Sequence, residues 1–211
     1  MELRNNMACF PIFIDIKQKK CLIVGGGKVA LRKVETLLRY GACVYVVAEQ
    51  ICEDICEKLP SAQRRTGHVT ETDIEKSVLV IAATSSRETN HRIAELCHSR
   101  NIPVNVIDAP EECTFIFPAV VQKGDVSIGI NTGGKSPILS QKIRKTIEAD
   151  IPDYYADLAD QLGNLREYVK VHFKDEKDRR RILKSAAAEA FAQERTLSRE
   201  EINEIIRQDK K

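Results

Sequence analysis

A run of three glycines constrains this chain more than any other feature. Four apolar residues at positions 21–24 lead directly into it, and an amphipathic helical pattern follows, with its apolar face at Val29, Ala30, Val34, Leu37 and Leu38. Strand, tight turn and helix in this order are typical of a dinucleotide-binding unit. A second apolar run, at 43–47, lies where such a unit places its second strand. The alternative is an ordinary strand-to-helix turn that holds no ligand.

The small residues of this turn have separate chemical reasons. Gly25 can adopt the backbone angles of the turn, and Gly27 has no side chain to hold a pyrophosphate away from the backbone. Ala30 lets the helix pack closely on the strand. The helix N-terminus offers free N–H groups and a partial positive charge to phosphates. We therefore predict that a dinucleotide pyrophosphate is bound by Gly25, Gly26, Gly27, Lys28 and Val29.

The end of the second strand predicts which dinucleotide binds. An acidic residue there accepts a hydrogen bond from the ribose 2′-hydroxyl of NAD. The chain has Ala48 at the strand end, followed by Glu49 and Gln50, so the match to this pattern is imperfect. No Lys or Arg lies between Gly41 and Glu57 to hold the 2′-phosphate of NADP. The pattern favours NAD over NADP.

The first half of the chain alternates strand and helix patterns, which predicts an α/β fold of the Rossmann type with a doubly wound parallel sheet. The further strand patterns are at 78–82 and 104–107, with a weak edge strand at 63–66, and helical patterns are at 52–59 and 87–100. Ligands of such sheets bind at the carboxyl ends of the strands. This rule adds Thr84, Ser85 and Asp108 to the predicted crevice.

The pattern changes after Asp108. Residues 113–121 are apolar and broken by Pro118, and 126–130 alternate like a half-buried strand. A glycine-containing turn at 131–137 then leads into a helix that runs to about Glu148, with Ser136 as its N-cap and Pro137 as its first residue. This turn suits an anion, and it equally suits a well-capped turn without a ligand.

The remaining residues, 151–211, are helical in pattern. Apolar residues recur at helical spacing at Tyr155, Leu158, Leu162, Leu165 and Val169. Ile182, Leu183, Ala186 and Ala190 form a further stripe, and Ser198 to Glu201 reads as the capping box of a last helix. A tail of about 60 residues is too thin to be a robust domain alone, so we expect it to pack on the sheet domain or on a second subunit.

Composition excludes several classes of function. The formal net charge of +2 gives no global field that attracts nucleic acid, and no segment is apolar enough to span a membrane. We see no signal peptide, and the seven scattered cysteines fit reduced thiols, so we expect a cytoplasmic protein. Cys52 and Cys56 lie one helical turn apart, but no second ligand pair matches them, and we predict no resident metal.

Asp108 is the carboxylate with the best position for chemistry. It follows a buried strand at the edge where a bound nicotinamide points, so it is a candidate general base, although an aspartate that caps a turn before Pro110 is the alternative. Other acid–base sets are missing. No tyrosine has a lysine four residues on, as a short-chain dehydrogenase requires, and no Cys/His zinc constellation is present.

Several coupled motifs carry a resemblance to a known family. They are Phe10-Pro11-Ile12-Phe13-Ile14-Asp15-Ile16, the run from Val104 through Asp108-Ala109-Pro110 to Cys113-Thr114-Phe115-Ile116-Phe117-Pro118-Ala119, and Asn131-Thr132-Gly133-Gly134-Lys135-Ser136-Pro137. In this order and spacing they resemble the precorrin-2 dehydrogenase family, the amino-terminal half of sirohaem synthases. The likeness is close over residues 8–150 and looser over the tail.

The resemblance implies oxidation of precorrin-2 to sirohydrochlorin with NAD as hydride acceptor, and in some relatives insertion of ferrous iron to give sirohaem. It implies that Asp108 is the catalytic residue. It also implies contacts with the tetrapyrrole from Asn105, Thr114, Thr132, Gly133, Gly134, Lys135 and Ser136. Lys142, Arg144 and Lys145 lie close by in the sequence and suit the substrate's carboxylates.

The resemblance further implies a homodimer and a division by role. Residues 1–112 form the NAD-binding domain, 113–150 a dimerisation and substrate-binding region, and 151–211 a helical domain. The methyltransferase half of fused sirohaem synthases does not follow in this sequence. Two alternatives remain: a non-enzymatic NAD-binding redox sensor, which would not require Asp108, and a dedicated ferrochelatase, against which the intact glycine turn argues.

Overall fold

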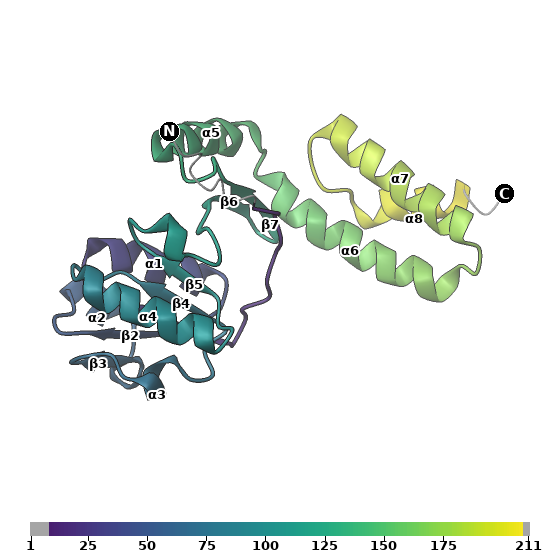
Figure 1. The fold of residues 1–211 in the computed structure, drawn as a ribbon. Helices are drawn as coiled ribbons and strands as arrows, with labels where there is room; N and C mark the ends of the chain where they lie inside the picture. Colours follow the sequence, from purple (N-terminus) through teal and green to yellow (C-terminus); the bar gives the residue numbers. More distant parts are fainter. Residues whose placement is uncertain (1–8, 209–211) are drawn as a thin grey trace. The chain divides into compact units, whose positions relative to one another are not determined.

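The computed structural model describes residues 9–208 (Figure 1). The chain forms two compact units, the first ending at Phe117 and the second beginning at Pro118. We describe each unit by itself. The division by role into residues 1–112, 113–150 and 151–211 stays a prediction, because it concerns function rather than compactness.

The first unit is built on a five-stranded parallel sheet. Its strand order is β3-β2-β1-β4-β5, which is the order of the Rossmann fold and confirms the predicted fold class. The strands are β1 (Lys20–Val24), β2 (Cys43–Ala48), β3 (Arg64–Thr66), β4 (Leu79–Ala82) and β5 (Val104–Val106). Val24 pairs with Val47 on one side and with Ala82 on the other, so the carboxyl ends of the central strands lie at one edge.

Helices cover this sheet through two separate apolar clusters. Alternate residues of β1 belong to different clusters. Cys21 and Ile23 pack with α1 (Lys28–Arg39) and α2 (Glu53–Lys58). Leu22 and Val24 pack with α3 (Glu71–Ile74) and α4 (Arg87–Ser99). This division follows from the period of two along a strand. Short 3₁₀ turns occupy Ser61–Gln63 and Pro110–Glu112.

Two details of the first unit differ from the sequence analysis. Val29, expected on the apolar face of α1, is 44% exposed, while Ala30, Val34 and Leu37 are buried as predicted. The sequence analysis also missed α3. Thr70 and Asp73 form a capping box at its start, which stabilises this single turn.

The second unit begins with an antiparallel hairpin and continues as helices. Its elements are β6 (Ala119–Lys123), β7 (Val126–Ile130), α5 (Pro137–Asp150), α6 (Tyr154–His172), α7 (Glu176–Gln193) and α8 (Arg199–Gln208). The core is a cluster from α6, α7 and α8 that includes Leu158, Leu165 and Ile182. Helix α5 has no buried residue.

The predicted helix starts in this unit are confirmed. The Ser136 hydroxyl accepts a hydrogen bond from the Leu139 N–H at 3.2 Å, with Pro137 in the first turn of α5. At α8, the Ser198 N–H donates to Glu201 at 2.6 Å and the Glu201 N–H donates to the Ser198 hydroxyl at 3.2 Å. Strand β6 was not predicted as a strand. Across the described residues, no helix is both long and apolar enough to cross a membrane.

Candidate active site

The glycine turn connects β1 to α1 at the carboxyl edge of the sheet. Gly25 has φ +131°, and a Cβ there would lie 2.2 Å from the Ala83 carbonyl oxygen. A Cβ on Gly26 would lie 1.9 Å from the Gln50 carbonyl oxygen, whereas a Cβ on Gly27 would meet nothing within 4 Å. Two glycines are therefore required by packing. The third leaves the backbone open on the side where a pyrophosphate can approach.

The first turn of α1 has free backbone donors. Gly27 is its N-cap and no side chain caps the helix, so the N–H groups at its start, which include those of Lys28 and Val29, have no side-chain acceptor. No acidic residue lies in this turn. The helix dipole then favours an anion at this end. The geometry fits the diphosphate of a dinucleotide.

The residues after β2 are held against the glycine turn. The Gly25 N–H donates to the Val47 carbonyl at 2.9 Å, and the Cys52 N–H donates to the Gly26 carbonyl at 2.9 Å. Ala48, Glu49 and Gln50 lie between these two bonds, so the structure brings the predicted ribose-binding residues next to the predicted pyrophosphate-binding ones. The Glu49 carboxylate lies beside the His68 imidazole, with 3.1 Å between Oε1 and Nδ1.

The loop after β4 is organised by a residue that the sequence analysis did not select. Asn90 of α4 is 5% exposed, and its Oδ1 accepts from the Thr84 hydroxyl at 2.7 Å and from the Thr84 N–H at 3.2 Å. Its Nδ2 donates to the Thr84 carbonyl at 3.1 Å. Thr84 and the exposed Ser85 are thereby fixed at the same sheet edge as the glycine turn. A single asparagine inside a helix pattern gives no signal of this contact.

Asp108 follows β5 at that same edge and is exposed. It has φ +56°, in the left-handed region that non-glycine residues rarely adopt. The strained position is held from both sides, since the Ile107 N–H donates to the Ala82 carbonyl at 3.0 Å and Ala109 is buried. Gln18, Lys76, Asn101 and Glu194 share this backbone region, and aspartate is one of the residue types that adopt it most readily, so the position of Asp108 at the sheet edge is the stronger signal.

Two predicted substrate residues near Asp108 have structural contacts. The Asn105 side chain is 9% exposed and donates to the Phe115 carbonyl at 3.1 Å. The Thr114 hydroxyl accepts from the Val104 N–H at 2.8 Å, at the opposite end of β5 from Asp108. Cys113 completes this packing, because its Sγ accepts from the Val106 N–H at 3.1 Å, and burial raises the pKa of its thiol.

Lys33 of α1 is a further titratable group that the sequence analysis did not select. Its ammonium group lies 3.8 Å from the centroid of the Phe117 ring. Burial lowers the pKa of Lys33 to about 8, although the nearby Cys113 thiol acts in the opposite direction. Within the first unit, Lys33 therefore holds the segment that follows Asp108 against α1 through a cation–π contact.

The predicted anion turn belongs to the second unit. The Asn131 side chain accepts from the Gly133 N–H at 2.9 Å, and the Thr132 hydroxyl donates to the Ser136 carbonyl at 3.0 Å. Gly133 and Gly134 have φ of +64° and +70°. Lys135 is exposed beside them. The turn is thus shaped by its own side chains, and it stands in a different unit from Asp108.

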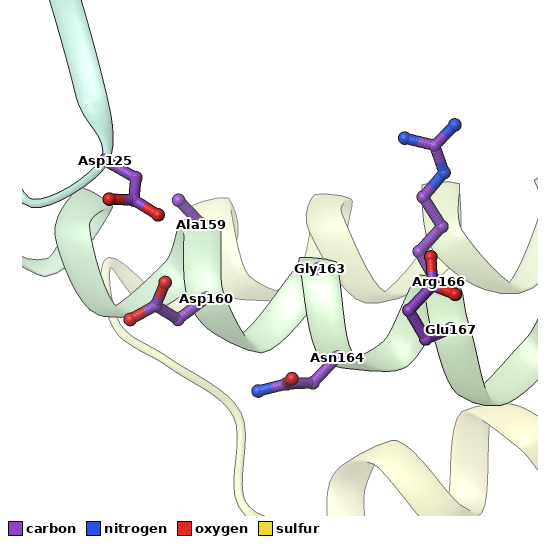
Figure 2. A pocket seen from close by; sticks show the side chains of 7 residues that line it. All are labelled: Asp125, Ala159, Asp160, Gly163, Asn164, Arg166 and Glu167. Carbon is purple, nitrogen blue, oxygen red and sulfur yellow. The ribbon is translucent and has the colours of Figure 1, made fainter. Parts of the chain in front are cut away.

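A hollow of about 550 Å³ lies along α6 in the second unit (Figure 2). Asp125, from the turn between β6 and β7, and Asp160 lie at one end of it, with Asn164, Arg166 and Glu167 further along the helix. None of the residues predicted for cofactor or substrate lines this hollow. Among the described residues, no group of three or more His, Cys, Asp or Glu side chains is placed to hold a metal ion.

The sheet order, the glycine turn and the uncapped start of α1 define a dinucleotide-binding unit of the Rossmann type. Residues 12–119 match the family described as "Putative NAD(P)-binding", and residues 123–150 match the family described as "Sirohaem biosynthesis protein central". The chain belongs to this NAD(P)-binding family, and the second match continues directly after the first.

Siroheme synthases of other organisms are similar to this chain in sequence. The chain is 41% identical over 177 residues to a siroheme synthase of Ruthia magnifica, a match that covers 82% of this chain and 37% of the relative. It is 39% identical over 194 residues to a siroheme synthase of Nitrosospira multiformis, which covers 89% of this chain and 41% of the relative. The chain thus spans about two fifths of the length of these relatives.

A solved structure shares the fold. The structure of SirC, a precorrin-2 dehydrogenase, superposes with a TM-score of 0.77 at 22% identity, over 96% of this chain and 99% of that one. The likeness confirms the fold of a Rossmann-type sheet followed by a hairpin and helices.

Proposed function

We propose that this chain is an NAD-dependent precorrin-2 dehydrogenase that forms sirohydrochlorin in sirohaem biosynthesis. The observation that carries the proposal is the strained, exposed Asp108 at the same sheet edge as the open glycine turn. The siroheme synthase relatives and the fold shared with SirC support the choice of substrate.

In this proposal Gly25–Val29 hold the cofactor's pyrophosphate. Ala48, Glu49 and Gln50 line its adenosine ribose, and Thr84 and Ser85 lie beside it on the way to the nicotinamide. We assign NAD rather than NADP because the Glu49 carboxylate accepts a 2′-hydroxyl and repels a 2′-phosphate. NAD, when bound, supplies the hydride acceptor.

Asp108 is the proposed catalytic residue. Its carboxylate accepts a proton from the tetrapyrrole as a hydride leaves to the cofactor, so the substrate loses both without a charged intermediate. The left-handed backbone at Asp108 sets the direction in which its side chain leaves the main chain. The buried Ala109 and the Cys113 contacts keep that orientation.

We assign the substrate's carboxylates to the second unit's turn. Asn105 and Thr114 of the first unit stay predicted substrate contacts, although their side chains already bond the Phe115 carbonyl and the Val104 N–H. The exposed Lys135 suits a carboxylate, whereas the start of α5 offers few free donors, because Pro137 has no N–H and Ser136 already accepts from the Leu139 N–H. The residues of this turn that we assign to the substrate are Thr132, Gly133, Gly134, Lys135 and Ser136. The proposal extends to ferrous iron as a second substrate, inserted into the sirohydrochlorin product.

We also propose that the chain acts as a homodimer. Helix α5 buries no residue, and its Ile138 and Leu139 are 83% and 50% exposed. A second copy that covers this apolar surface removes it from water. In this division 113–150 serve dimerisation and substrate binding, and 151–211 form the helical domain. We place the dimer in the cytoplasm, in keeping with seven free thiols.

The decisive experiment is anaerobic incubation of the pure protein with precorrin-2 and NAD, in which NADH and tetrapyrrole absorbance are followed before and after ferrous iron is added. Formation of NADH and sirohydrochlorin is expected. Metal insertion faster than in an enzyme-free control supports the iron assignment. Tight NADH binding without any turnover would overturn the dehydrogenase and favour an NAD-binding sensor. Light scattering coupled to gel filtration tests the dimer.

A further inference from the structure

His68 and Glu49 meet at the end of the sheet where the ribose of a dinucleotide belongs. Glu49 directly follows β2, and His68 lies two residues beyond β3. The two strands are parallel neighbours with Ala48 opposite Thr66, and the Gly67 N–H donates to the Ala48 carbonyl at 2.9 Å. The backbone therefore fixes where the two side chains emerge.

The main chain of His68 is held by a network of its own. The Arg65 guanidinium donates to the His68 carbonyl at 2.9 Å and to Asp73 Oδ1 at 3.1 Å. Partial burial of Asp73 acts to raise its pKa, but bonds from Arg65 and Thr70 outweigh it, so the pKa of this carboxyl is lowered. Asp73 is thus an anion that keeps Arg65, and through it His68, in place.

The imidazole is aimed by a glycine with left-handed backbone. Gly67 has φ +131°, and a Cβ on it would lie 3.3 Å from Nη1 of Arg65. The chain can therefore reverse after β3 and bring Nδ1 of His68 to 3.1 Å from Oε1 of Glu49. The contact is an ion pair when the imidazole is protonated.

The pair does little for stability. The His68 and Glu49 side chains are 86% and 73% exposed, and exposed ion pairs contribute roughly 0–1 kcal/mol. Gly67 and the Arg65–Asp73 network fix the backbone of His68 at the ligand edge, and the exposed side-chain pair formed there adds little to stability.

We propose that His68 is a specificity-determining residue that holds the Glu49 carboxylate for the ribose 2′-hydroxyl. The inference rests on the proposed NAD site and deepens it. The contact with His68 engages Oε1 and leaves Oε2 for the hydroxyl, so the carboxylate is held near this position before the dinucleotide arrives. A 2′-phosphate meets the same fixed negative charge. Without His68, Glu49 can swing away, which weakens NAD binding and relaxes the exclusion of NADP.

The test compares binding of NADH and NADPH to the full chain, followed by nicotinamide fluorescence. The wild-type chain is expected to prefer NADH. His68→Ala should weaken NADH binding by up to about fivefold, the effect of losing one exposed charged contact, and narrow the NADH-to-NADPH preference. His68→Asn, whose amide can replace Nδ1 as the donor, should restore both. His91→Ala, which removes another exposed histidine paired with glutamate, should change neither.

A double-mutant cycle shows whether His68 acts through Glu49. In a Glu49→Gln chain, His68→Ala should leave the NADH affinity unchanged. An equal loss in both backgrounds overturns the inference, and so does a His68→Ala chain with the wild-type preference. These outcomes leave the NAD site standing. If the wild-type chain binds neither NADH nor NADPH, the proposed cofactor function itself fails, and this inference fails with it.

Discussion

The two units of this chain bury their apolar residues in different ways. The first unit packs both faces of its sheet, and most of the largest fully buried side chains belong to it, such as Ile23, Ile81 and Ile93. Among these largest side chains of the described residues, Ile182 is the member from the second unit. In the second unit a 14-residue helix, α5, buries nothing. Both units have a core of their own, but the second leaves the apolar residues Ile138 and Leu139 of α5 exposed.

The two glycine turns show the same difference. In the first unit, Gly25 and Gly26 are required by close backbone contacts with Ala83 and Gln50. In the second unit, Gly133 and Gly134 face open space, and only their left-handed backbone requires glycine. A turn built by packing is fixed before a ligand arrives. The second turn is held by the hydrogen bonds of Asn131 and Thr132 rather than by packing around its glycines, and the predictions below test this contrast.

The largest expected effect is at Asp108. Asp108→Ala removes the proposed proton acceptor, so turnover of precorrin-2 should fall about 10²- to 10⁴-fold, the usual contribution of a general base. NADH binding should stay as in the wild type. Steady-state rates and fluorescence titration measure the two quantities. Asp125→Asn in the second unit's hairpin is the matched control. Normal turnover by Asp108→Ala would remove Asp108 from the mechanism.

The next-largest effect is expected at the glycines of the first unit's turn. In Gly26→Ala the new Cβ meets the Gln50 backbone, so the protein should lose about 1–3 kcal/mol of stability and more than tenfold in NADH affinity. Gly27→Ala meets nothing within 4 Å, so it should weaken NADH binding with little loss of stability. Thermal unfolding and fluorescence titration give both values.

Gly134→Ala completes this series in the second unit. Its φ of +70° strains an alanine by about 1 kcal/mol, with no change in NADH binding. A loss of NADH affinity in Gly134→Ala as large as in Gly26→Ala would mean that the two turns do not differ as described.

Local patterns in the sequence predicted the first unit well. Residues 21–24 and 78–82 are continuous apolar runs because the sheet is covered on both faces, and the three glycines that follow the first run mark its end clearly. The Ser136 and Ser198 caps were also predicted, because a helix cap depends on residues only a few positions apart.

Features that depend on distant residues were not predicted. Strand β6 was missed because Pro118 precedes it and Gln122 and Lys123 end it, so its apolar pattern is short, and its pairing with β7 defines it. The exposure of Val29 depends on what α1 packs against rather than on its spacing. Asn90 and His68 were missed at the site because their partners lie on other elements.

The first unit should gain stability at alkaline pH through Lys33. Burial holds the pKa of Lys33 at about 8 in the folded protein, below the 10.5 of a free lysine. The folded state therefore binds fewer protons than the unfolded state between these values, and this contribution to stability rises from pH 8 to 10.5. After allowance for solvent screening it amounts to about 1 kcal/mol.

Lys33→Met isolates this contribution. The buried thiols of Cys21 and Cys97, whose pKa burial raises to about 11, act in the opposite direction above pH 9, so the difference between the two proteins is the useful quantity. At pH 7 the Lys33→Met protein should be more stable to unfolding than the wild type, and this difference in stability should shrink by pH 10. Urea unfolding at both pH values measures it. A constant difference would mean that Lys33 is charged throughout.

The smallest expected effect lies in the second unit. Here a stabilising contribution is lost as the pH falls, whereas the Lys33 contribution appears as the pH rises. Bonds from Arg195, the Ser198 N–H and Gln193 lower the pKa of Glu201 to about 2. A lowered carboxyl pKa stabilises the fold above the unfolded value of 4.5, and this contribution is lost as the pH falls from 4.5 toward 2. Glu201→Gln should therefore make helix α8 less sensitive to acid.

Circular dichroism during urea unfolding at pH 5 and pH 3 should show a smaller loss of stability for this variant than for the wild type. The first unit is the control. Its Asp73 carboxylate is the same in both proteins, so its loss of stability between pH 5 and pH 3 should be equal in the two. If Glu201→Gln changed the acid response of both units alike, the two would unfold as one body, and the description of two units, each with a core of its own, would be wrong.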